Sequence, residues 1–305
     1  MLRIHKILFP TDFSPASRAA LDHALLWTEL GDAELVLLHV LSPRTADPFN
    51  PAHHFPAPEE FEARLHQLAD SEMALFVPKT EKPLRIRQVV RRAPAVERGI
   101  LDFAESDDVD LIVLGTHGRR GPAHLLIGST AAELLRRSER AVLVVPSRSQ
   151  RKAGRLRRIL APTDFSASAR HAIAHARELA ASTGATLELF HVLPSLEVPL
   201  PMNPGSFGGG IVAELEPAAR AALAELAAAA GAEVKVETEV WQGPAAATIL
   251  NRAAETEADL IVLATHGHSG LDRLLLGSVT EKVARLSSCP VLVLPAHGWS
   301  LLPEA

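Results

Sequence analysis

One long internal repeat sets the organisation of this chain. Residues 7–14 read Ile-Leu-Phe-Pro-Thr-Asp-Phe-Ser, and residues 159–166 repeat them with a single change, from Phe9 to Ala161. The two copies are offset by 152 residues there and by 149 residues between 110–114 and 259–263. A small net slip inside a repeat of this length indicates a duplicated domain whose connecting loops differ in length.

The repeat and the chain length together predict two domains. At about 150 residues per domain, the 305 residues suffice for two copies. We predict a first domain at residues 1–147, a basic linker at 148–156 and a second domain at 157–297. The linker sets Arg and Lys among Ser, Gln and Gly without periodicity, which is typical of a solvated connection.

Composition and charge exclude several classes of protein. Hydrophobic residues make up 47% and charged residues 22% of the chain, as in an ordinary globular protein and unlike a fibrous or disordered one. The formal net charge of −5 has the wrong sign for a dedicated nucleic-acid binder, so we expect no nucleic-acid partner. The single cysteine, Cys289, allows no internal disulfide and fits a reducing compartment.

The same composition argues against a membrane or secreted protein. No apolar run approaches the roughly 20 residues that cross a bilayer. The first six residues lead straight into a strand-like run and lack the apolar region and cleavage site of a signal peptide. We therefore expect a cytoplasmic protein with no membrane partner.

Short apolar runs of the kind found in buried strands recur along each copy. Continuous apolar runs are typical of strands covered on both faces, and strands that alternate with helices indicate parallel sheets with right-handed crossovers. The predicted strands lie at 4–9, 35–41, 86–90, 111–114 and 141–145, and in the second copy at 158–161, 187–193, 234–240, 260–263 and 291–294.

The stretches between these runs have helical character. In the first copy helices are predicted at 14–30, 59–77, 94–105 and 129–137, the first with a Ser14 cap and an end at Gly31. The Pro-rich segments 42–58 and 194–210 are predicted to be surface loops, with mobile glycines at 208–210. The predicted fold class is α/β, with two tandem doubly wound domains, each a five-stranded parallel sheet flanked by helices in a Rossmann-like arrangement.

A glycine pattern follows the fourth predicted strand, and this is where ligands of doubly wound sheets bind, beyond the carboxyl ends of the strands. Gly115 and Gly118 follow that strand, and Gly128, Ser129 and Thr130 open the next helix, which makes a G-x2-G-x9-G-S pattern. Glycines permit positive φ and close backbone approach, and the amides of a helix N-terminus favour an anion. The pattern therefore predicts a phosphate-binding turn.

Two further candidate residues end neighbouring strands. Asp12 follows Pro10 and Thr11 after the first strand, and its carboxylate is suited to bond a ribose hydroxyl, a base edge or a metal-bound phosphate. Val40 ends the second strand, where it is suited to flank an adenine. Asp12 and Ser129 also have a purely structural interpretation, since aspartate and serine are ordinary helix-capping residue types. Their occurrence on strand ends, in one order and in both copies, favours a binding site.

On these residues the chain resembles the universal stress proteins, in their tandem two-domain form, over nearly its whole length. The resemblance lies in the Pro-Thr-Asp-Phe-Ser motifs at 10–14 and 162–166, the glycine turn at 110–118, the Leu-Gly-Ser motif at 276–278 and the closing strand at 290–295. It implies a Rossmann-like fold of the adenine nucleotide alpha hydrolase type, and in the ATP-binding branch of the family the glycine pattern holds the phosphates. The residues to which it assigns nucleotide binding are Pro10, Thr11, Asp12, Val40, Gly115, Gly118, Gly128, Ser129 and Thr130, and in the second copy Pro162, Thr163, Asp164, Val192, Ala264, Gly267, Gly277, Ser278 and Val279.

The second copy departs from the family pattern at Ala264, which stands where the first copy has Gly115. A position that needs positive φ penalises alanine by about 1 kcal/mol or more, whereas a position that needs only a small side chain accepts it. Nucleotide binding by the second copy therefore stays open at this point.

The motifs favour a binding protein over an enzyme. Neither copy has a Walker P-loop, a G-x-S-x-G elbow or a cysteine nucleophile with an evident base, so we assign no catalytic residue and expect at most slow ATP hydrolysis. The 14 histidines include no H-E-x-x-H motif, and we predict no metal site built from protein ligands alone. We expect Mg²⁺ to accompany ATP through its phosphates.

Three functions stay open from the sequence. The first is an ATP-binding stress-response or signalling switch that an unidentified protein partner reads. The second is an interaction scaffold without nucleotide, in which the glycines only make tight turns. The third is a weak ATPase or an adenylyltransferase. The resemblance further implies that the two domains pair with each other, as single-domain relatives do in dimers, and it allows a homodimer.

Overall fold

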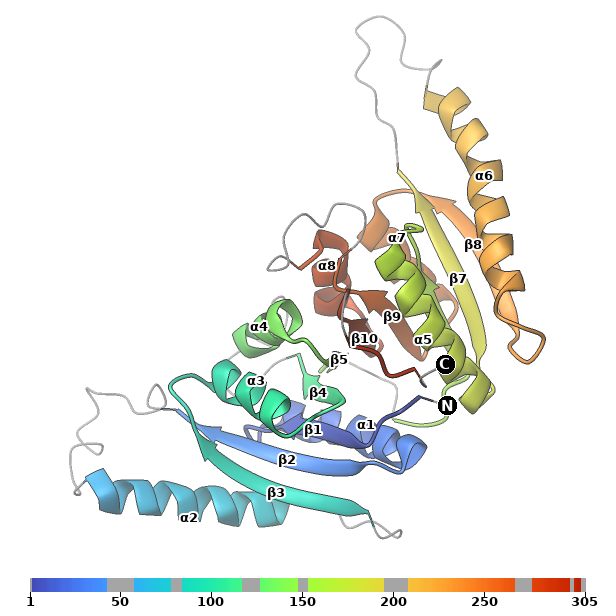
Figure 1. Cartoon of the computed structure of the whole chain (residues 1–305). Coiled ribbons are helices and arrows are strands. Elements are labelled where there is room, and N and C mark those ends of the chain that lie inside the picture. Colours follow the sequence, from blue (N-terminus) through green and yellow to red (C-terminus); the bar gives the residue numbers. More distant parts are fainter. Residues whose placement is uncertain are drawn as a thin grey trace, which may run out of the picture. The chain divides into compact units, whose positions relative to one another are not determined.

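The computed structural model describes residues 2–42, 58–77, 84–116, 127–147, 153–194, 208–266, 276–296 and 299–302. The chain divides into two compact units, built mainly from Arg3–Ser147 and from Arg155–Ala305 (Figure 1). We call them the N-terminal half and the C-terminal half and describe each by itself.

The N-terminal half is a parallel sheet with its first strand at the centre. Its hydrogen-bonded strand order is β3-β2-β1-β4-β5, and every described pairing is parallel. The order reverses between β1 and β4, which defines the switch point of a doubly wound fold. The elements are β1 (Lys6–Pro10), α1 (Pro15–Gly31), β2 (Glu34–Leu41), α2 (Pro58–Phe76), β3 (Arg85–Arg92), α3 (Val96–Ser106), β4 (Leu111–Gly115), α4 (Ser129–Arg137) and β5 (Ala141–Val145).

The C-terminal half repeats this arrangement. Its strand order is β8-β7-β6-β9-β10, again with parallel pairings and a switch point, here between β6 and β9. The predicted fold class is confirmed in both halves. The elements are β6 (Arg158–Pro162), α5 (Ala167–Thr183), β7 (Thr186–Leu193), α6 (Gly208–Ala228), β8 (Val236–Gln242), α7 (Ala245–Glu255), β9 (Leu260–Ala264), α8 (Ser278–Leu286) and β10 (Val291–Leu294).

Helices cover both faces of each sheet. In the N-terminal half α1 packs on β1, β2 and β4, and α2 packs on β2 and β3, while α3 and α4 lie side by side on the face opposite to α2 (Figure 1). The chain moves outward through β1, β2 and β3 and then returns to β4, so right-handed crossovers place the later helices on the other face. Every side chain of β5 is buried, which explains the unbroken apolar run at 141–145.

The ends of α1 bear out one prediction and correct another. Ser14 caps the helix, because its side chain accepts a hydrogen bond from the Ser17 amide at 3.1 Å. Gly31, however, is the last helical residue, and the left-handed residue that ends the helix is Asp32, with φ 47°. Gly31 is small for a different reason: a methyl group there would lie 2.8 Å from the carbonyl oxygen of Ile4. In the C-terminal half the left-handed residue that ends the corresponding helix is a glycine, Gly184, with φ 71°.

The predicted loop at 194–210 is wrong at its end. Residues 208–210, which we expected to be mobile glycines, form the first turn of α6. Glycine costs only about 1 kcal/mol per helical position, and the length of the helix that follows offsets this. The rest of this predicted loop from 195 onward, and residues 43–57 of the other, lie outside the described residues. None of the helices in the described ranges is long and apolar enough to span a membrane.

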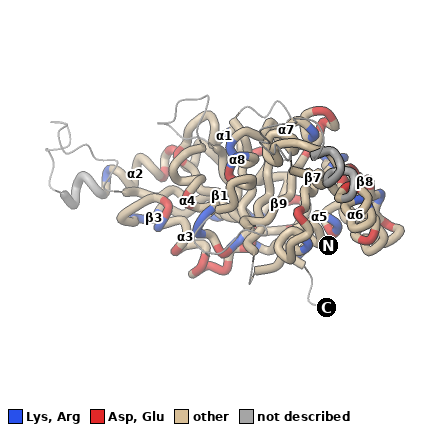
Figure 2. Tube along the Cα trace, turned by 90° about the horizontal axis from the view of Figure 1, so that it is seen from above, with Lys and Arg blue, Asp and Glu red and all other residues tan. Residues whose placement is uncertain are grey.

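Ion pairs join the strands near the amino-terminal edge of each sheet. In the N-terminal half Asp107 pairs with Arg87 and, at 3.0 Å, with Lys6. Burial disfavours the charged form of Asp107, but the hydrogen bonds from Arg87 and Lys6 outweigh it and lower the pKa of this carboxyl. In the C-terminal half Arg158 joins Glu188 and Glu237 at 3.0 and 2.7 Å. Figure 2 shows basic and acidic residues interspersed along the tubes of both halves.

Candidate functional site

The predicted site residues of the N-terminal half meet at the carboxyl edge of its sheet, at the switch point. Pro10 ends β1 and Gly115 ends β4, and these two strands are neighbours. The amide of Gly128 donates to the carbonyl oxygen of Thr116 at 2.7 Å, which brings the start of α4 back to the end of β4. Asp12, two residues beyond β1, is half-buried at the same edge.

The segment after β1 is a tight hydrogen-bonded turn. Asp12 Oδ1 accepts the amide of Ser14 at 3.0 Å, and Thr11 Oγ1 accepts the amide of Phe13 at 3.0 Å. The Thr11 hydroxyl also accepts the Ser17 hydroxyl at 2.9 Å and is buried. Thr11 is therefore a structural member of the site, whereas Asp12 uses one carboxylate oxygen to shape the turn.

A histidine and a phenylalanine, which the sequence reasoning missed, complete this turn. Phe13 has φ 60°, in the left-handed region. Its ring stacks on His39 with the centroids 4.6 Å apart, and His39 Nδ1 lies 2.8 Å from the Thr11 carbonyl oxygen. The repeated His-Val pairs at 39–40 and 191–192 were the available signal, but only Val was considered.

Val40 lies with its side chain turned away from solvent. It is 6% exposed, and a methyl group on Gly99 of α3 would lie 2.8 Å from its Cγ1. The valine side chain therefore packs against α3, and Gly99 makes the space for it. Any contact between Val40 and a ligand at the edge falls to its backbone.

Two of the glycines in this pattern, Gly115 and Gly277, serve close packing. Gly115, Gly128 and Gly277 all have negative or extended φ. A methyl group at Gly115 would lie 3.2 Å from the carbonyl oxygen of Ala16, so the position calls for a small residue and has no need of the left-handed region. Its counterpart Ala264 is likewise the last residue of a strand and has no positive φ. The penalty considered for alanine is therefore absent.

The N-terminus of α4 presents amides without a side-chain cap. Its cap residue is Gly128, which has no side chain, and the amide of Gly128 is already used by Thr116. This leaves the first-turn amides of Ser129 and Thr130 facing the edge, beside an exposed Ser129 and a half-buried Thr130. An uncapped helix N-terminus with adjacent hydroxyls favours an anion.

The C-terminal half reproduces this geometry almost atom for atom. The Phe165 amide bonds Thr163 Oγ1 at 2.9 Å, the Ser166 amide bonds Asp164 Oδ1 at 3.0 Å, His191 Nδ1 lies 2.7 Å from the Thr163 carbonyl, and Gly277 donates to the Thr265 carbonyl at 2.8 Å. Pro162 ends β6 and is buried, Val192 is half-buried, Ser278 is exposed and Val279 is half-buried. Gly118 and Gly267, the second glycines of the two patterns, lie outside the described residues.

The edge offers few ligands for a bare metal ion. Within the described parts of the chain, no three His, Cys, Asp or Glu side chains come together in a metal-binding group. Cys289 is buried, at 2% exposure. Asp12 and Asp164 each contribute a single carboxylate at their own edge, which suits a ribose hydroxyl or a phosphate-bound Mg²⁺.

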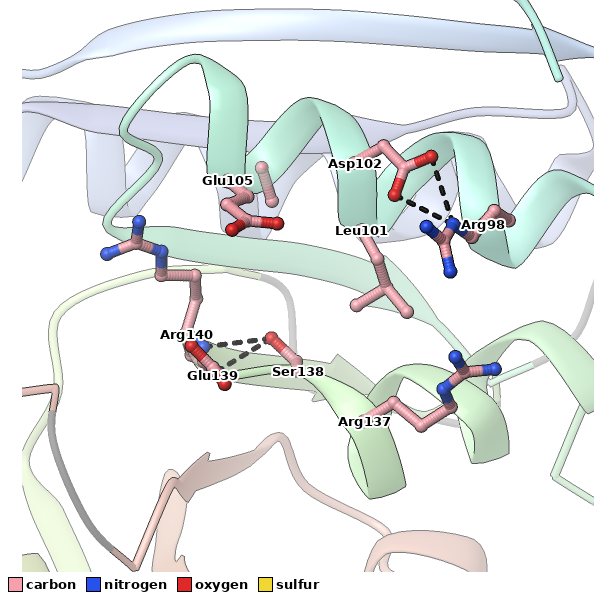
Figure 3. Close-up of a pocket in the computed structure, with 9 residues that line it drawn as sticks. Arg98, Leu101, Asp102, Glu105, Arg137, Ser138, Glu139 and Arg140 are labelled. Carbon is pink, nitrogen blue, oxygen red and sulfur yellow. Dashed lines mark hydrogen bonds and ion pairs between the residues drawn. The ribbon is translucent and has the colours of Figure 1, made fainter. Parts of the chain in front are cut away.

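A separate cleft of about 200 Å³ lies between α3 and α4 (Figure 3). Leu101 points from α3 towards α4, and the charged side chains around it are of both signs. Arg98 pairs with Asp102 at 2.8 Å, and the Ser138 hydroxyl bonds the backbone of Arg140. None of the predicted site residues lines this cleft, so we assign it no ligand.

Comparison with known proteins now decides the family. The profile of the universal stress protein family matches residues 3–146 and again 155–295. The chain belongs to the universal stress protein family. The match falls on both halves, so this is a tandem universal stress protein, and the resemblance inferred from the motifs is confirmed.

Individual relatives agree with this assignment. A universal stress protein of Mycolicibacterium smegmatis is 29% identical over 293 residues, covering 94% of this chain and 96% of the relative. A universal stress protein of Methanocaldococcus jannaschii is 31% identical over 152 residues, covering 46% of this chain and 93% of its own. The crystal structure of a universal stress protein from Archaeoglobus fulgidus has a TM-score of 0.60 at 22% identity, covering 95% of this chain and 96% of that one, which supports the shared fold.

Proposed function

We propose that this universal stress protein is a cytoplasmic nucleotide switch that binds ATP with Mg²⁺ at the carboxyl edge of each half. Occupancy of the two sites would set a conformational or assembly state that a protein partner reads. The proposal assigns no catalytic residue.

One observation carries the proposal. In each half an uncapped helix N-terminus and an aspartate turn stand on either side of the switch point, where doubly wound sheets bind their ligands. The helix N-terminus favours an anion, which suits a phosphate, and the aspartate carboxylate accepts hydrogen bonds, which suits the hydroxyls of a ribose. Two copies of one constellation in a chain with otherwise divergent loops favour a shared ligand over coincidence.

The residues fit the parts of the nucleotide as follows. Ser129 and Thr130 would hold phosphate oxygens through their amides and hydroxyls, and Asp12 would bond the ribose with the carboxylate that shapes its turn. The backbone of Val40 would meet the adenine edge, because the valine side chain is packed against α3. Mg²⁺ would bind the phosphates and neutralise part of their charge.

We propose that the C-terminal half also binds nucleotide. Ala264 has no positive φ, so the doubt raised by its replacement of glycine does not stand. The half differs in a second respect, since Val279 stands where Thr130 offers a hydroxyl. The second site should therefore bind nucleotide more weakly than the first. The difference in binding free energy should be about that of one hydrogen bond to a charged phosphate oxygen.

The test is to titrate the purified full chain with Mg-ATP and count sites by calorimetry. We expect about two sites per chain. Ser129→Glu and Ser278→Glu should each remove one site, because both residues are exposed at the first helical position and the added carboxylate repels phosphate. That carboxylate also stabilises a helix N-terminus, so these variants should stay folded.

Ala247→Glu is the matched control, since it places the same charge in the exposed first turn of α7. It should leave both sites intact. A wild-type chain that binds no Mg-ATP would refute the switch and favour the interaction scaffold. Binding that survives both Ser→Glu substitutions would place the ligand elsewhere on the molecule.

A further inference from the structure

The left-handed phenylalanine after the first strand of each half needs an explanation. Phe13 has φ 60° and Phe165 has φ 65°. A residue with a Cβ, and a bulky one above all, is seldom found there, because the left-handed conformation costs about 1–2 kcal/mol. Such strain persists only where surrounding contacts enforce it, and it concentrates at binding sites.

Apart from the bond from the Thr11 amide to the Leu38 carbonyl oxygen at 2.8 Å, which continues the pairing of β1 with β2, the hydrogen bonds of the turn are local. They join Thr11 to Phe13, Asp12 to Ser14, and Ser14 to Ser17. These bonds fix Thr11 and Ser14 at the two ends of the turn, and Asp12 and Phe13 lie between them. A further anchor on the middle of the turn therefore helps to set the position of the Asp12 carboxylate.

The neighbouring strand supplies that anchor through a histidine. His39 Nδ1 lies 2.8 Å from the Thr11 carbonyl oxygen, and because a carbonyl only accepts, this nitrogen carries the hydrogen. The imidazole ring stacks on Phe13 at 4.6 Å with an interplanar angle of 29°. The His39 side chain thus contacts the turn at two points, the carbonyl oxygen of Thr11 and the ring of the left-handed Phe13.

The same pair of histidine contacts recurs in the C-terminal half, where the other contacts of the phenylalanine differ. His191 bonds the Thr163 carbonyl at 2.7 Å and lies 4.5 Å from the Phe165 ring. Phe13 is supported in addition by the edge of Phe76 at 5.7 Å, whereas the carbonyl of Phe165 accepts a hydrogen bond from the Arg170 guanidinium at 2.7 Å. Both halves share the histidine contacts, together with the backbone bond from the threonine amide to the neighbouring strand, which joins Thr163 to Phe190 at 2.8 Å.

We propose that His39 and His191 are positioning residues, which fix the aspartate turn so that its carboxylate meets the ribose of the nucleotide. This inference rests on the proposed function. It assigns the histidines an effect on the nucleoside end of the ligand only, because the phosphates would lie at the start of α4 or α8 and not at this turn.

The experiment uses the full-length Ser278→Glu variant, in which only the N-terminal site is to be titrated. Two probes are compared, Mg-ATP and inorganic Mg-tripolyphosphate, which has no ribose or base. His39→Ala should weaken Mg-ATP binding at least about tenfold and leave Mg-tripolyphosphate binding unchanged within about twofold. His66→Ala, at a half-buried histidine of α2, is the matched control and should change neither.

Two conservative variants separate the two contacts of the histidine. His39→Asn keeps an N–H donor near the position of Nδ1 but loses the ring, and His39→Phe keeps a ring but loses the donor. Each should recover part of the lost ATP affinity, with Asn recovering more because it restores the bond that holds the carbonyl.

The outcomes distinguish this inference from the proposed function. Unchanged Mg-ATP affinity in His39→Ala would overturn the positioning role while the nucleotide switch stood. Equal loss of both probes would show that the histidine only supports the fold of the half, and would also overturn it. Failure of the parent variant to bind Mg-ATP, with the wild type also inactive, would remove both proposals together.

Discussion

A buried carboxylate in the C-terminal half offers a sharp test of how the two copies are stabilised. Glu188 is the third residue of β7, is fully buried and bonds two arginines, Arg158 at 3.0 Å and Arg252. The N-terminal half has Val36 at the equivalent strand position and Phe103 at the position of Arg252, both buried. Charged side chains therefore meet between β7 and α7 in the C-terminal half, whereas apolar side chains occupy the equivalent positions of β2 and α3 in the N-terminal half.

The structure sets the size of the expected effect. Removing one partner of a buried ion pair costs about 3–5 kcal/mol, because the other charge stays buried without its counterion. Arg158 keeps Glu237 at 2.7 Å, and Arg252 keeps Glu255 at 3.7 Å, so Glu188→Val should cost about 3 kcal/mol, at the lower end of that range. Adding Arg252→Phe recreates the apolar pair and should return the half to within about 1 kcal/mol of the wild type.

Hydrogen exchange is the suitable assay, because a chain of two units need not unfold in a single transition. Protection of the β7 and α7 amides reports the C-terminal half, while β2 and α3 serve as the internal reference within the same sample. A double variant that is as unstable as Glu188→Val alone, or more so, would refute the reasoning. It would mean that the charge left on Arg252 is not what makes the single variant unstable.

Three further predictions concern the site and the C-terminal segment. Val279→Thr should raise the Mg-ATP affinity of the second site by up to about tenfold, towards a site with the hydroxyl of Thr130, as measured by calorimetry. Ala264→Gly should leave that affinity within about twofold, because alanine carries no left-handed strain there; a large gain would contradict this account. Burial lowers the pKa of His175 to about 4 from 6.5, and its Nε2 accepts the Leu301 amide at 3.0 Å. Since the folded state favours the neutral ring, the C-terminal half should lose about 3 kcal/mol as the pH falls from 6.5 to about 4, and His175→Gln should flatten that part of the stability curve.

The candidate site shows where sequence reasoning succeeds. Asp12, Gly115 and Ser129 were predicted to share one edge of the sheet, and the structure places them there, because parallel strands end together and each of these residues follows or ends a recognisable element. The expected use of the glycines was only partly right. Gly115 is small because Ala16 of α1 approaches it, and a close approach between distant segments leaves no mark in the local pattern.

The residues that were missed depend on contacts between distant segments. His39 acts on Thr11 and Phe13 across 28 and 26 residues of sequence, and apart from its repetition as His191 nothing in its strand sets it apart from other half-buried strand residues. Glu188 interrupts the apolar run of β7, which was a signal, but its partner Arg252 lies 64 residues away on a helix. Only the packing of α7 against β7 shows that this charge is buried.

By itself, the sequence determined the duplication, the α/β class and the approximate course of the strands and helices of both halves. These follow from hydrophobic periodicity and from turn and cap residues, which act over a few neighbouring positions. The tertiary structure decided three features: the left-handed turn that His39 contacts, the packing of the Val40 side chain against α3, and the buried pair of Glu188 and Arg252 where the N-terminal half has apolar side chains. Each of these depends on which distant side chains meet in a closely packed interior, and a meeting of that kind is set by the fold as a whole.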